Sequence, residues 1–203
     1  MENLTQIKQD LIRAAQRAYT RGIQTGSGGN VSARIPGENL MVVKPSGISF
    51  ADCDQDNLVI TDFEGNLVAG TLKPTREALL HGVLYQHLPE VGGIVHCHSP
   101  WSIAWSFTKQ DIPALTYHAQ LKFGCPVATV DIDAPVVPKP EMARILSLFD
   151  ANPKLPAFLL VAHGVVALGK DAVDAEHVAE MVEETAQVAW LYHSGRCSGF
   201  INQ

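Results

Sequence analysis

Residues 92–102 read GGIVHCHSPWS and residues 157–164 read AFLLVAHG. Each stretch is a short apolar run, which is typical of a buried strand, and each run ends in histidine. His96 and His98 are two positions apart, so the period of a strand places both imidazoles on one face. His163 directly follows the second run. Polar side chains at two strand ends indicate the edge of a site in a layered α/β protein.

On both sides of these two stretches, patterns typical of helices and of strands are mixed along the chain. Helices are predicted at 4–21, 75–88, from Pro100, at 140–149 and at 171–194, and strands at 40–43, 58–61, 93–98, 126–132 and 157–162. This order predicts an α/β protein with a central sheet and helices on both faces. Some strand connections contain no helix, so the sheet is expected to be mixed. No repeat or flexible linker interrupts the chain, so residues 1–203 are predicted to form a single domain.

Composition excludes several classes of protein. The 203 residues are 46% apolar and 18% charged, which is enough to bury a sizeable core. The net charge of −6 disfavours a duplex nucleic-acid partner. No run approaches the ~20 apolar residues of a membrane span, and the charged N-terminus is not a secretory signal. The four cysteines are not in CxxC spacing, so a reduced, cytoplasmic protein is expected.

Three histidines from two strand ends form a plausible ligand set for a divalent metal. Three imidazoles leave a coordination position open for substrate, whereas a closed structural site needs four ligands. The alternative is that His96 and His98 are ordinary residues at the end of a strand. Glu77, in the first turn of the helix at 75–88, is either a fourth group at this site or an acid favoured there by the helix dipole. Zinc suits three imidazoles best, and manganese, cobalt or iron also accept them.

A second set of residues is suited to binding an anion. Residues 26–30, GSGGN, form a turn whose backbone N–H groups can cradle a phosphate, although a tight surface turn is the alternative. A second small turn, Pro-Ser-Gly at 45–47, follows a strand, and Thr75 and Arg76 open a helix. If the three segments converge, they bind a dianion through N–H, hydroxyl and guanidinium donors.

Taken together, five segments resemble the class II aldolase/adducin family. They are GSGGNVSAR at 26–34, KPSGIS at 44–49, KPTREALLH at 73–81, GGIVHCHSPWS at 92–102 and LLVAHGVVALG at 159–169. Their order and spacing match over nearly the whole chain. The resemblance implies a three-layer α/β/α sandwich on a mixed, mostly antiparallel central sheet. It also implies a homotetramer with active sites at the subunit interfaces.

The resemblance implies a role for individual residues. His96, His98 and His163 become the ligands of one divalent metal per subunit, and Glu77 ligates the resting metal before acting as acid/base. Tyr117, in IPALTYHA at 112–119, resembles a tyrosine that a neighbouring subunit contributes as a proton donor. The phosphate-binding positions fall on Gly29, Asn30, Ser46, Gly47 and Thr75, and Arg76 stands where the fuculose-phosphate aldolases have a second serine.

The activity that this resemblance implies is aldol cleavage of a ketose 1-phosphate of the fuculose, ribulose or 5-deoxyribulose type. The products are dihydroxyacetone phosphate and an aldehyde. A phosphorylated sugar-acid decarboxylase keeps the same acid and histidines, and Arg76 would then serve a carboxylate. In the methylthioribulose-1-phosphate dehydratases the catalytic glutamate follows the HxH segment, and residues 115–124 contain no acid. The 4-epimerases use a tyrosine near the C-terminus, and none follows Tyr192. An adducin-like interaction module would lack the three histidines.

Overall fold

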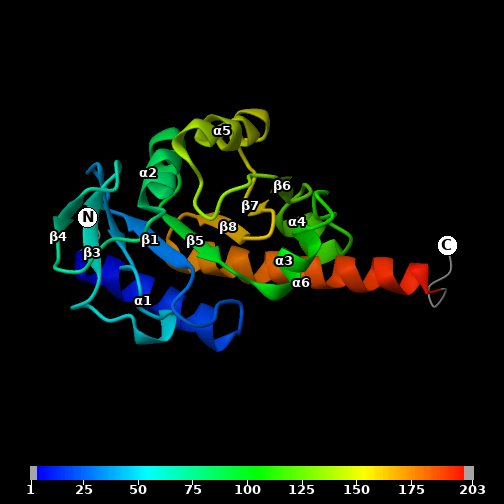
Figure 1. The fold of residues 1–203 in the computed structure, drawn as a ribbon, viewed down its shortest axis with the longest axis horizontal. Helices are drawn as coiled ribbons and strands as arrows, with labels where there is room; N and C mark the ends of the chain where they lie inside the picture. The colour runs from blue at the N-terminus through cyan, green and yellow to red at the C-terminus, as the bar shows by residue number, and fades with distance from the viewer. Residues whose placement is uncertain (1–3, 199–203) are drawn as a thin grey trace.

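The structure, a computed structural model, describes residues 4–198 (Figure 1). The helices are α1 (Leu4–Thr20), α2 (Ala78–His87), α3 (Pro100–Ser106), α4 (Tyr117–Lys122), α5 (Met142–Ala151) and α6 (Ala172–Cys197), with 3-10 turns η1 (Phe50–Asp52) and η2 (Lys139–Glu141). The strands are β1 (Asn30–Arg34), β2 (Leu40–Val43), β3 (Val59–Asp62), β4 (Leu67–Ala69), β5 (Gly93–Cys97), β6 (Ala128–Val130), β7 (Ala157–Leu160) and β8 (Gly164–Gly169).

The eight strands form one sheet in the order β4-β3-β2-β1-β5-β8-β7-β6. Every neighbouring pair is antiparallel except β6 and β7, which are parallel. The predicted mixed, mostly antiparallel sheet is therefore confirmed. Strand β5 lies in the middle, where its His96 is in register with Asn30 of β1 and Val166 of β8. The histidine segment is thus held by neighbouring strands on both sides.

Helices cover both faces of the sheet and produce two separate cores (Figure 1). On one face, the apolar sides of α1 and α6 pack on Val95 and Cys97 of β5. On the other face, α2 and α5 pack on Ile94. Because side chains alternate along a strand, His96 lies on the same face as Ile94, beneath α2 and α5. The predicted three-layer sandwich is confirmed.

Strands β1, β4 and β8 and the short helix α4 were not predicted from the pattern. Strand β8 is buried on both faces and reads GVVALG, without the alternation of apolar and polar residues that marks a half-exposed strand. Strand β1 reads NVSAR and does alternate, but its five residues are too short a run to be marked by period alone. Strand β4 is a three-residue edge strand whose side chains are all exposed. Burial on both faces and extreme shortness both remove the periodic signal on which the prediction depends.

The predicted helix over 75–88 was wrong at its start, because α2 begins at Ala78. The preceding residues are instead held against another segment. Pro74 forms an isolated bridge with Pro45, and the Ser46 N–H donates to the carbonyl of Lys73 over 2.8 Å. This pairing holds residues 73–74 beside the turn at 45–47, and the helix starts only after that contact ends.

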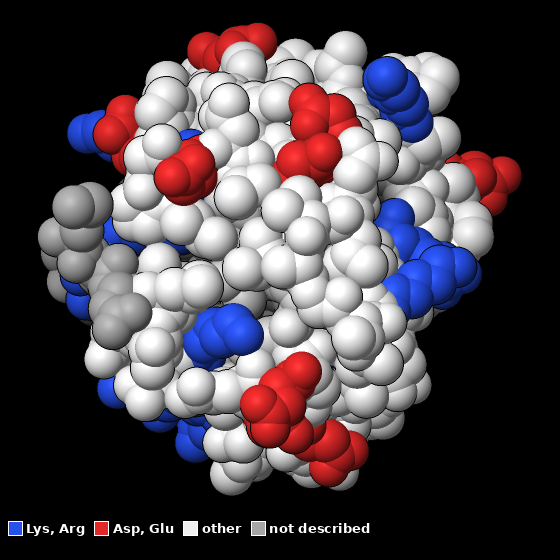
Figure 2. Space-filling view, turned by 90° about the vertical axis from the view of Figure 1, so that its left-hand side faces the viewer, with Lys and Arg blue, Asp and Glu red and all other residues white. Residues whose placement is uncertain are grey.

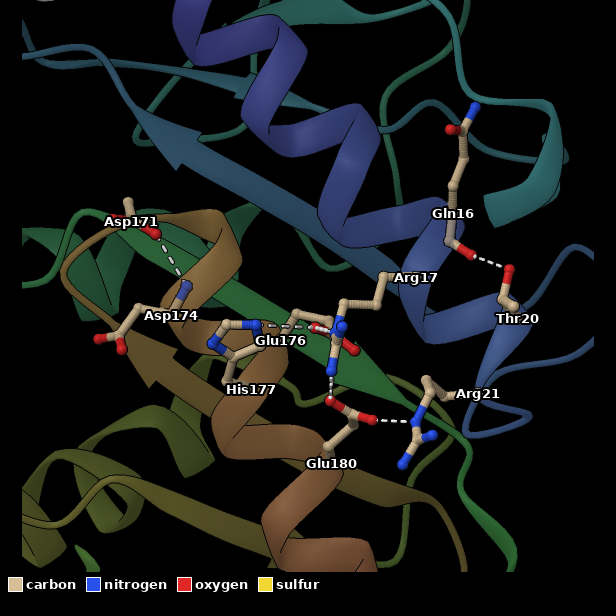
Figure 3. A network of polar contacts seen from close by, with 9 residues as sticks. All are labelled: Gln16, Arg17, Thr20, Arg21, Asp171, Asp174, Glu176, His177 and Glu180. Atoms are coloured by element: carbon tan, nitrogen blue, oxygen red, sulfur yellow. Dashed lines mark hydrogen bonds and ion pairs between the residues drawn. The ribbon is translucent and has the colours of Figure 1, made fainter.

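An ion-pair network joins α1 to α6 (Figure 3). Arg17 lies 2.8 Å from the buried Oε2 of Glu176 and also pairs with Glu180, which in turn pairs with Arg21. Burial raises the pKa of Glu176 to about 7, and the neighbouring Glu180 adds to the shift. Arg17 opposes that shift, so the contact between the two helices is held by a shared arginine.

Charged side chains on the face seen in Figure 2 are interspersed rather than gathered into one patch of a single sign. Both Lys or Arg and Asp or Glu side chains appear there among many uncharged ones. Within residues 4–198, no helix is both long enough and apolar enough to cross a membrane.

Gly82→Ala is expected to lower the free energy of unfolding by about 3 kcal/mol, because a Cβ at this position overlaps backbone. The added carbon would collide with the carbonyl group of Phe63, which belongs to the turn after β3. Backbone cannot move aside as a flexible side chain can, so α2 would be displaced from the sheet. Urea unfolding measures the change. The control is Gly37→Ala, where the added carbon meets nothing within 4 Å. Its cost is limited to strain at φ +82°, so equal losses for the two variants would contradict the prediction.

Candidate active site

The three histidines predicted from the strand ends converge on one point. Nε2 of His96 lies 3.1 Å from Nε2 of His98 and 3.2 Å from Nε2 of His163. Two nitrogens bound to one tetrahedral zinc lie about 3.3 Å apart, given Zn–N bonds of about 2.0 Å. Among the described residues, these three are the group of side chains whose ligand atoms lie close enough to hold a metal ion.

The backbone fixes the direction of these rings. Nδ1 of His96 lies 2.9 Å from the carbonyl oxygen of Val165, which can only accept, so Nδ1 carries the proton and Nε2 presents a lone pair. His163 follows a sharp turn in which Ala162 has a φ of +57°. The Ala162 N–H donates to Oγ of Ser106 over 3.0 Å, and this bond holds the turn.

Burial keeps the rings neutral, as metal binding requires. Burial is the main cause, and together with the neighbouring imidazoles it lowers the pKa of His96 to about 3 and that of His163 to about 4. Burial also lowers the pKa of His98. Three neutral imidazoles with their Nε2 atoms facing one another fit a divalent cation.

The metal-free protein is expected to lose stability as the pH falls below about 6.5. Burial lowers the pKa of His81 and of His96 to about 3 in the folded state, from an ordinary 6.5. Between these values the unfolded chain binds more protons than the folded one. Each histidine therefore lowers the free energy of unfolding by about 1.4 kcal/mol per pH unit as the pH falls.

Urea unfolding in the presence of a chelator, repeated across this pH range, measures the slope. The matched variant is His81→Asn, which removes one buried imidazole without touching the three clustered histidines. For this variant, the free energy of unfolding is expected to fall less steeply with decreasing pH, by about 1.4 kcal/mol per pH unit, which is the contribution of one histidine. An identical slope in the two proteins would show that His81 does not contribute.

Glu77 is the N-cap residue of α2 rather than a residue of its first turn, which corrects the predicted position. Its Oε2 accepts from Nδ2 of Asn30 over 2.7 Å and lies 3.5 Å from Nε2 of His96. Its Oε1 is buried and has no hydrogen-bond partner within residues 4–198. A buried carboxylate oxygen without a partner, beside three imidazoles, is a second observation that fits a cation at this point.

A cavity of about 480 Å³ opens beside the histidines. It is lined by every residue predicted for phosphate binding, namely Gly29, Asn30, Ser46, Gly47, Thr75 and Arg76, together with Glu77, His98 and His163. The pairing of segments 45–46 and 73–74 explains why the last two predicted segments meet. The three predicted anion-binding segments therefore converge on one pocket, which they share with His98, His163 and Glu77.

The pocket has two basic side chains, and one of them, Lys44, was not predicted. Lys44 is 1% exposed, and its Nζ donates to the carbonyls of Ile48, Pro45 and Ser27 over 2.6, 3.2 and 3.4 Å. Burial lowers its pKa. Arg76, by contrast, is exposed and forms no hydrogen bond or ion pair within residues 4–198. The sequence signal for Lys44 was its place directly after the apolar run 40–43, the same signal that identified His163.

Other lining residues were also missed, in particular the 132–136 segment and Val161. Apart from the carboxylate of Asp133 these side chains are apolar, and no sequence pattern singled them out. Tyr117 was predicted but does not line the pocket of its own chain. It begins α4 with 84% of its surface exposed. An exposed tyrosine remains available to a neighbouring copy of the chain.

Comparison with known proteins identifies a family and several relatives. Residues 9–190 match the family model for the class II aldolase and adducin N-terminal domain. The chain is 34% identical to the L-ribulose-5-phosphate 4-epimerase UlaF of Salmonella paratyphi B over 195 residues, which is 93% of this chain and 86% of that protein.

Solved structures agree in fold. YgbL from Klebsiella pneumoniae superposes with a TM-score of 0.82 at 26% identity, over 94% of this chain and 91% of that one. An L-fuculose 1-phosphate aldolase superposes with a TM-score of 0.83 at 25% identity, over 96% of this chain and 89% of that one. With a matching family model over most of its length and this fold, the chain belongs to the class II aldolase and adducin family.

Proposed function

We propose that this protein is a metal-dependent lyase that cleaves a ketose 1-phosphate to dihydroxyacetone phosphate and an aldehyde. The observation that carries the proposal is that two groups of residues share one pocket. Three neutral imidazoles meet beside the Glu77 carboxylate, and the glycine turn and the 45–47 turn line the same cavity. A substrate with a phosphate next to a carbonyl can contact both groups.

His96, His98 and His163 would hold one divalent cation, with zinc as the proposed ion. When bound, that ion supplies a Lewis acid beside the substrate carbonyl. The phosphate would be held by backbone N–H groups of the glycine turn, by the hydroxyls of Ser46 and Thr75, and by the guanidinium of Arg76.

Glu77 is proposed to move the proton at the carbon that becomes nucleophilic when the carbon–carbon bond breaks. Its position supports this role, because Glu77 lines the pocket, Asn30 holds Oε2, and the buried Oε1 has no hydrogen-bond partner within residues 4–198. Tyr117 is proposed to exchange a proton with the aldehyde-side oxygen in a neighbouring active site. Its exposure on α4 supports a contribution to another subunit of a homotetramer.

A second candidate is 4-epimerisation of a pentulose phosphate. The 34% identity to the L-ribulose-5-phosphate 4-epimerase UlaF supports this candidate. The same carbon–carbon cleavage serves both reactions, since an epimerase that rejoins the two fragments on the other face inverts one carbon. A phosphorylated sugar-acid decarboxylase is a third candidate, supported by the unpaired Arg76 in the pocket.

The experiment offers the metal-reconstituted protein a panel of phosphorylated sugars. The panel contains the 1-phosphates of fuculose, ribulose and 5-deoxyribulose, L-ribulose 5-phosphate, and phosphorylated sugar acids. A coupled reductase detects dihydroxyacetone phosphate, and proton NMR detects epimers. The expected result is metal-dependent release of dihydroxyacetone phosphate from a ketose 1-phosphate.

Conversion of L-ribulose 5-phosphate to its C4 epimer without free fragments would replace the aldolase proposal with the epimerase. Loss of carbon dioxide from a sugar acid would replace it with the decarboxylase. A protein that binds a divalent metal and turns over no member of the panel would contradict all three.

A further inference from the structure

Gln24 is a buried amide that contacts both the histidine segment and the residue before the glycine turn. It belongs to the connection between α1 and β1 and is 1% exposed. Its Oε1 accepts from the backbone N–H of His98 over 2.8 Å, and its Nε2 donates to the carbonyl of Thr25 over 2.7 Å. One side chain therefore holds the main chain at a clustered histidine and the main chain at the start of the glycine turn.

The glycine turn packs directly on this amide. A Cβ added at Gly29 would lie 2.7 Å from Cδ of Gln24 and 2.7 Å from the carbonyl oxygen of His96. A Cβ added at Gly28 would lie 2.8 Å from Nδ1 of His98 and 3.1 Å from Nε2 of Gln24. These glycines are required because the Gln24 amide and the histidine segment occupy the space that side chains would need.

These contacts place Gln24 between the glycine turn and the histidine segment. On one side, Gly28 and Gly29 line the cavity and belong to the turn assigned to phosphate. On the other side, Nε2 of His98 lies 3.1 Å from Nε2 of His96 in the histidine cluster. We propose that Gln24 is a positioning residue that sets the glycine turn in register with the His98 imidazole, so that metal and phosphate bind at a fixed separation.

The proposal rests on the function proposed above, and binding measurements separate the two. Gln24→Leu keeps the approximate volume but removes both polar contacts. The buried N–H of His98 then loses its acceptor, and the glycine turn loses its anchor at Thr25. A misplaced imidazole weakens metal binding, and a misplaced turn weakens anion binding, each by about tenfold, which is a typical effect of residues that orient metal ligands.

The experiment measures two dissociation constants at one temperature on the folded protein. Cobalt binding is followed by visible absorption, and inorganic phosphate binding to the metal-loaded protein by calorimetry. For Gln24→Leu both constants are expected to rise about tenfold relative to the wild type. Gln24→Glu keeps an oxygen that accepts from His98, so its cobalt dissociation constant is expected to stay within about threefold. This selective rescue is the result that a general loss of packing would not produce.

The matched control is Gln16→Leu. Gln16 lies on α1, and its Nε2 donates to the carbonyl of Cys53 over 3.3 Å, away from the pocket. This control is expected to keep both constants at the wild-type values. If Gln24→Leu does not fold, Gln24→Met provides the unbranched replacement for the same two measurements.

The outcomes separate the two proposals. In one outcome the wild type binds cobalt and phosphate, and the Gln24 variants bind both equally well although they are less stable to heat. Gln24 is then only a packing residue, and the positioning role is overturned. If the wild type itself binds neither ligand, the proposed function fails and the positioning role fails with it.

Discussion

Glu77→Gln is expected to lower kcat about a thousandfold while the metal stays bound. The replacement is nearly isosteric, and its amide oxygen can still accept from Nδ2 of Asn30, which now holds the carboxylate over 2.7 Å. The amide of the introduced glutamine cannot take up or release a proton at the pH of the assay. Because three imidazoles remain, the metal content is expected to stay at one ion per chain.

Steady-state kinetics on the substrate identified by the panel, with metal analysis of the same sample, measure both parts of this prediction. The matched control is Glu64→Gln, the same chemical change in the exposed turn after β3. It is expected to leave kcat within about twofold. If Glu77→Gln retained more than about a tenth of wild-type kcat, Glu77 would not be the group that moves the proton.

His163→Ala is expected to weaken binding of a divalent metal by more than about a hundredfold and to reduce turnover to background. Two imidazoles at the end of β5 cannot replace the third, which comes from a different strand end. The substitution is local, because Nδ1 of His163 has no hydrogen-bond partner within residues 4–198 and Nε2 contacts only the histidine cluster. The fold is therefore expected to survive it.

Competition with a colorimetric chelator measures the affinity, and circular dichroism checks the fold. The matched control is His177→Ala on α6, whose imidazole is 51% exposed and far from the cluster. It is expected to bind metal like the wild type. Unchanged metal affinity in His163→Ala would remove His163 from the ligand set and leave the metal site unexplained.

Backbone period explains how much of the site could be predicted from sequence. His96 and His98 share a face because they are two apart at the end of a strand, and this holds wherever that strand lies in the fold. His163 was found because a polar residue directly after a buried apolar run must meet a partner or a ligand. Lys44 likewise directly follows an apolar run, at 40–43, and it also lines the pocket. A polar residue directly after a buried strand therefore indicates this pocket at two positions.

Other features depend on contacts between distant segments. Gln24 has no motif of its own, and its importance arises only because β1 and β5 are neighbours that bring the glycine turn against His98. The start of α2 was predicted three residues too early because the pairing of Pro74 with Pro45 competes with the helix. A pairing of this kind overrides local helical preference, and no window of sequence around Pro74 reports it.

The local sequence is sufficient to identify the chemistry available to this protein: two strand ends that carry imidazoles, a carboxylate, two turns of small residues, and the Thr75 and Arg76 side chains. These are local properties, because the period of a strand and the conformations open to glycine act over a few residues. The tertiary structure decided that these groups share one pocket, which side chain holds them in register, and that Tyr117 faces outward. Those outcomes depend on strand order and on the packing of helices over the sheet, where the energy comes from contacts between residues far apart in the chain.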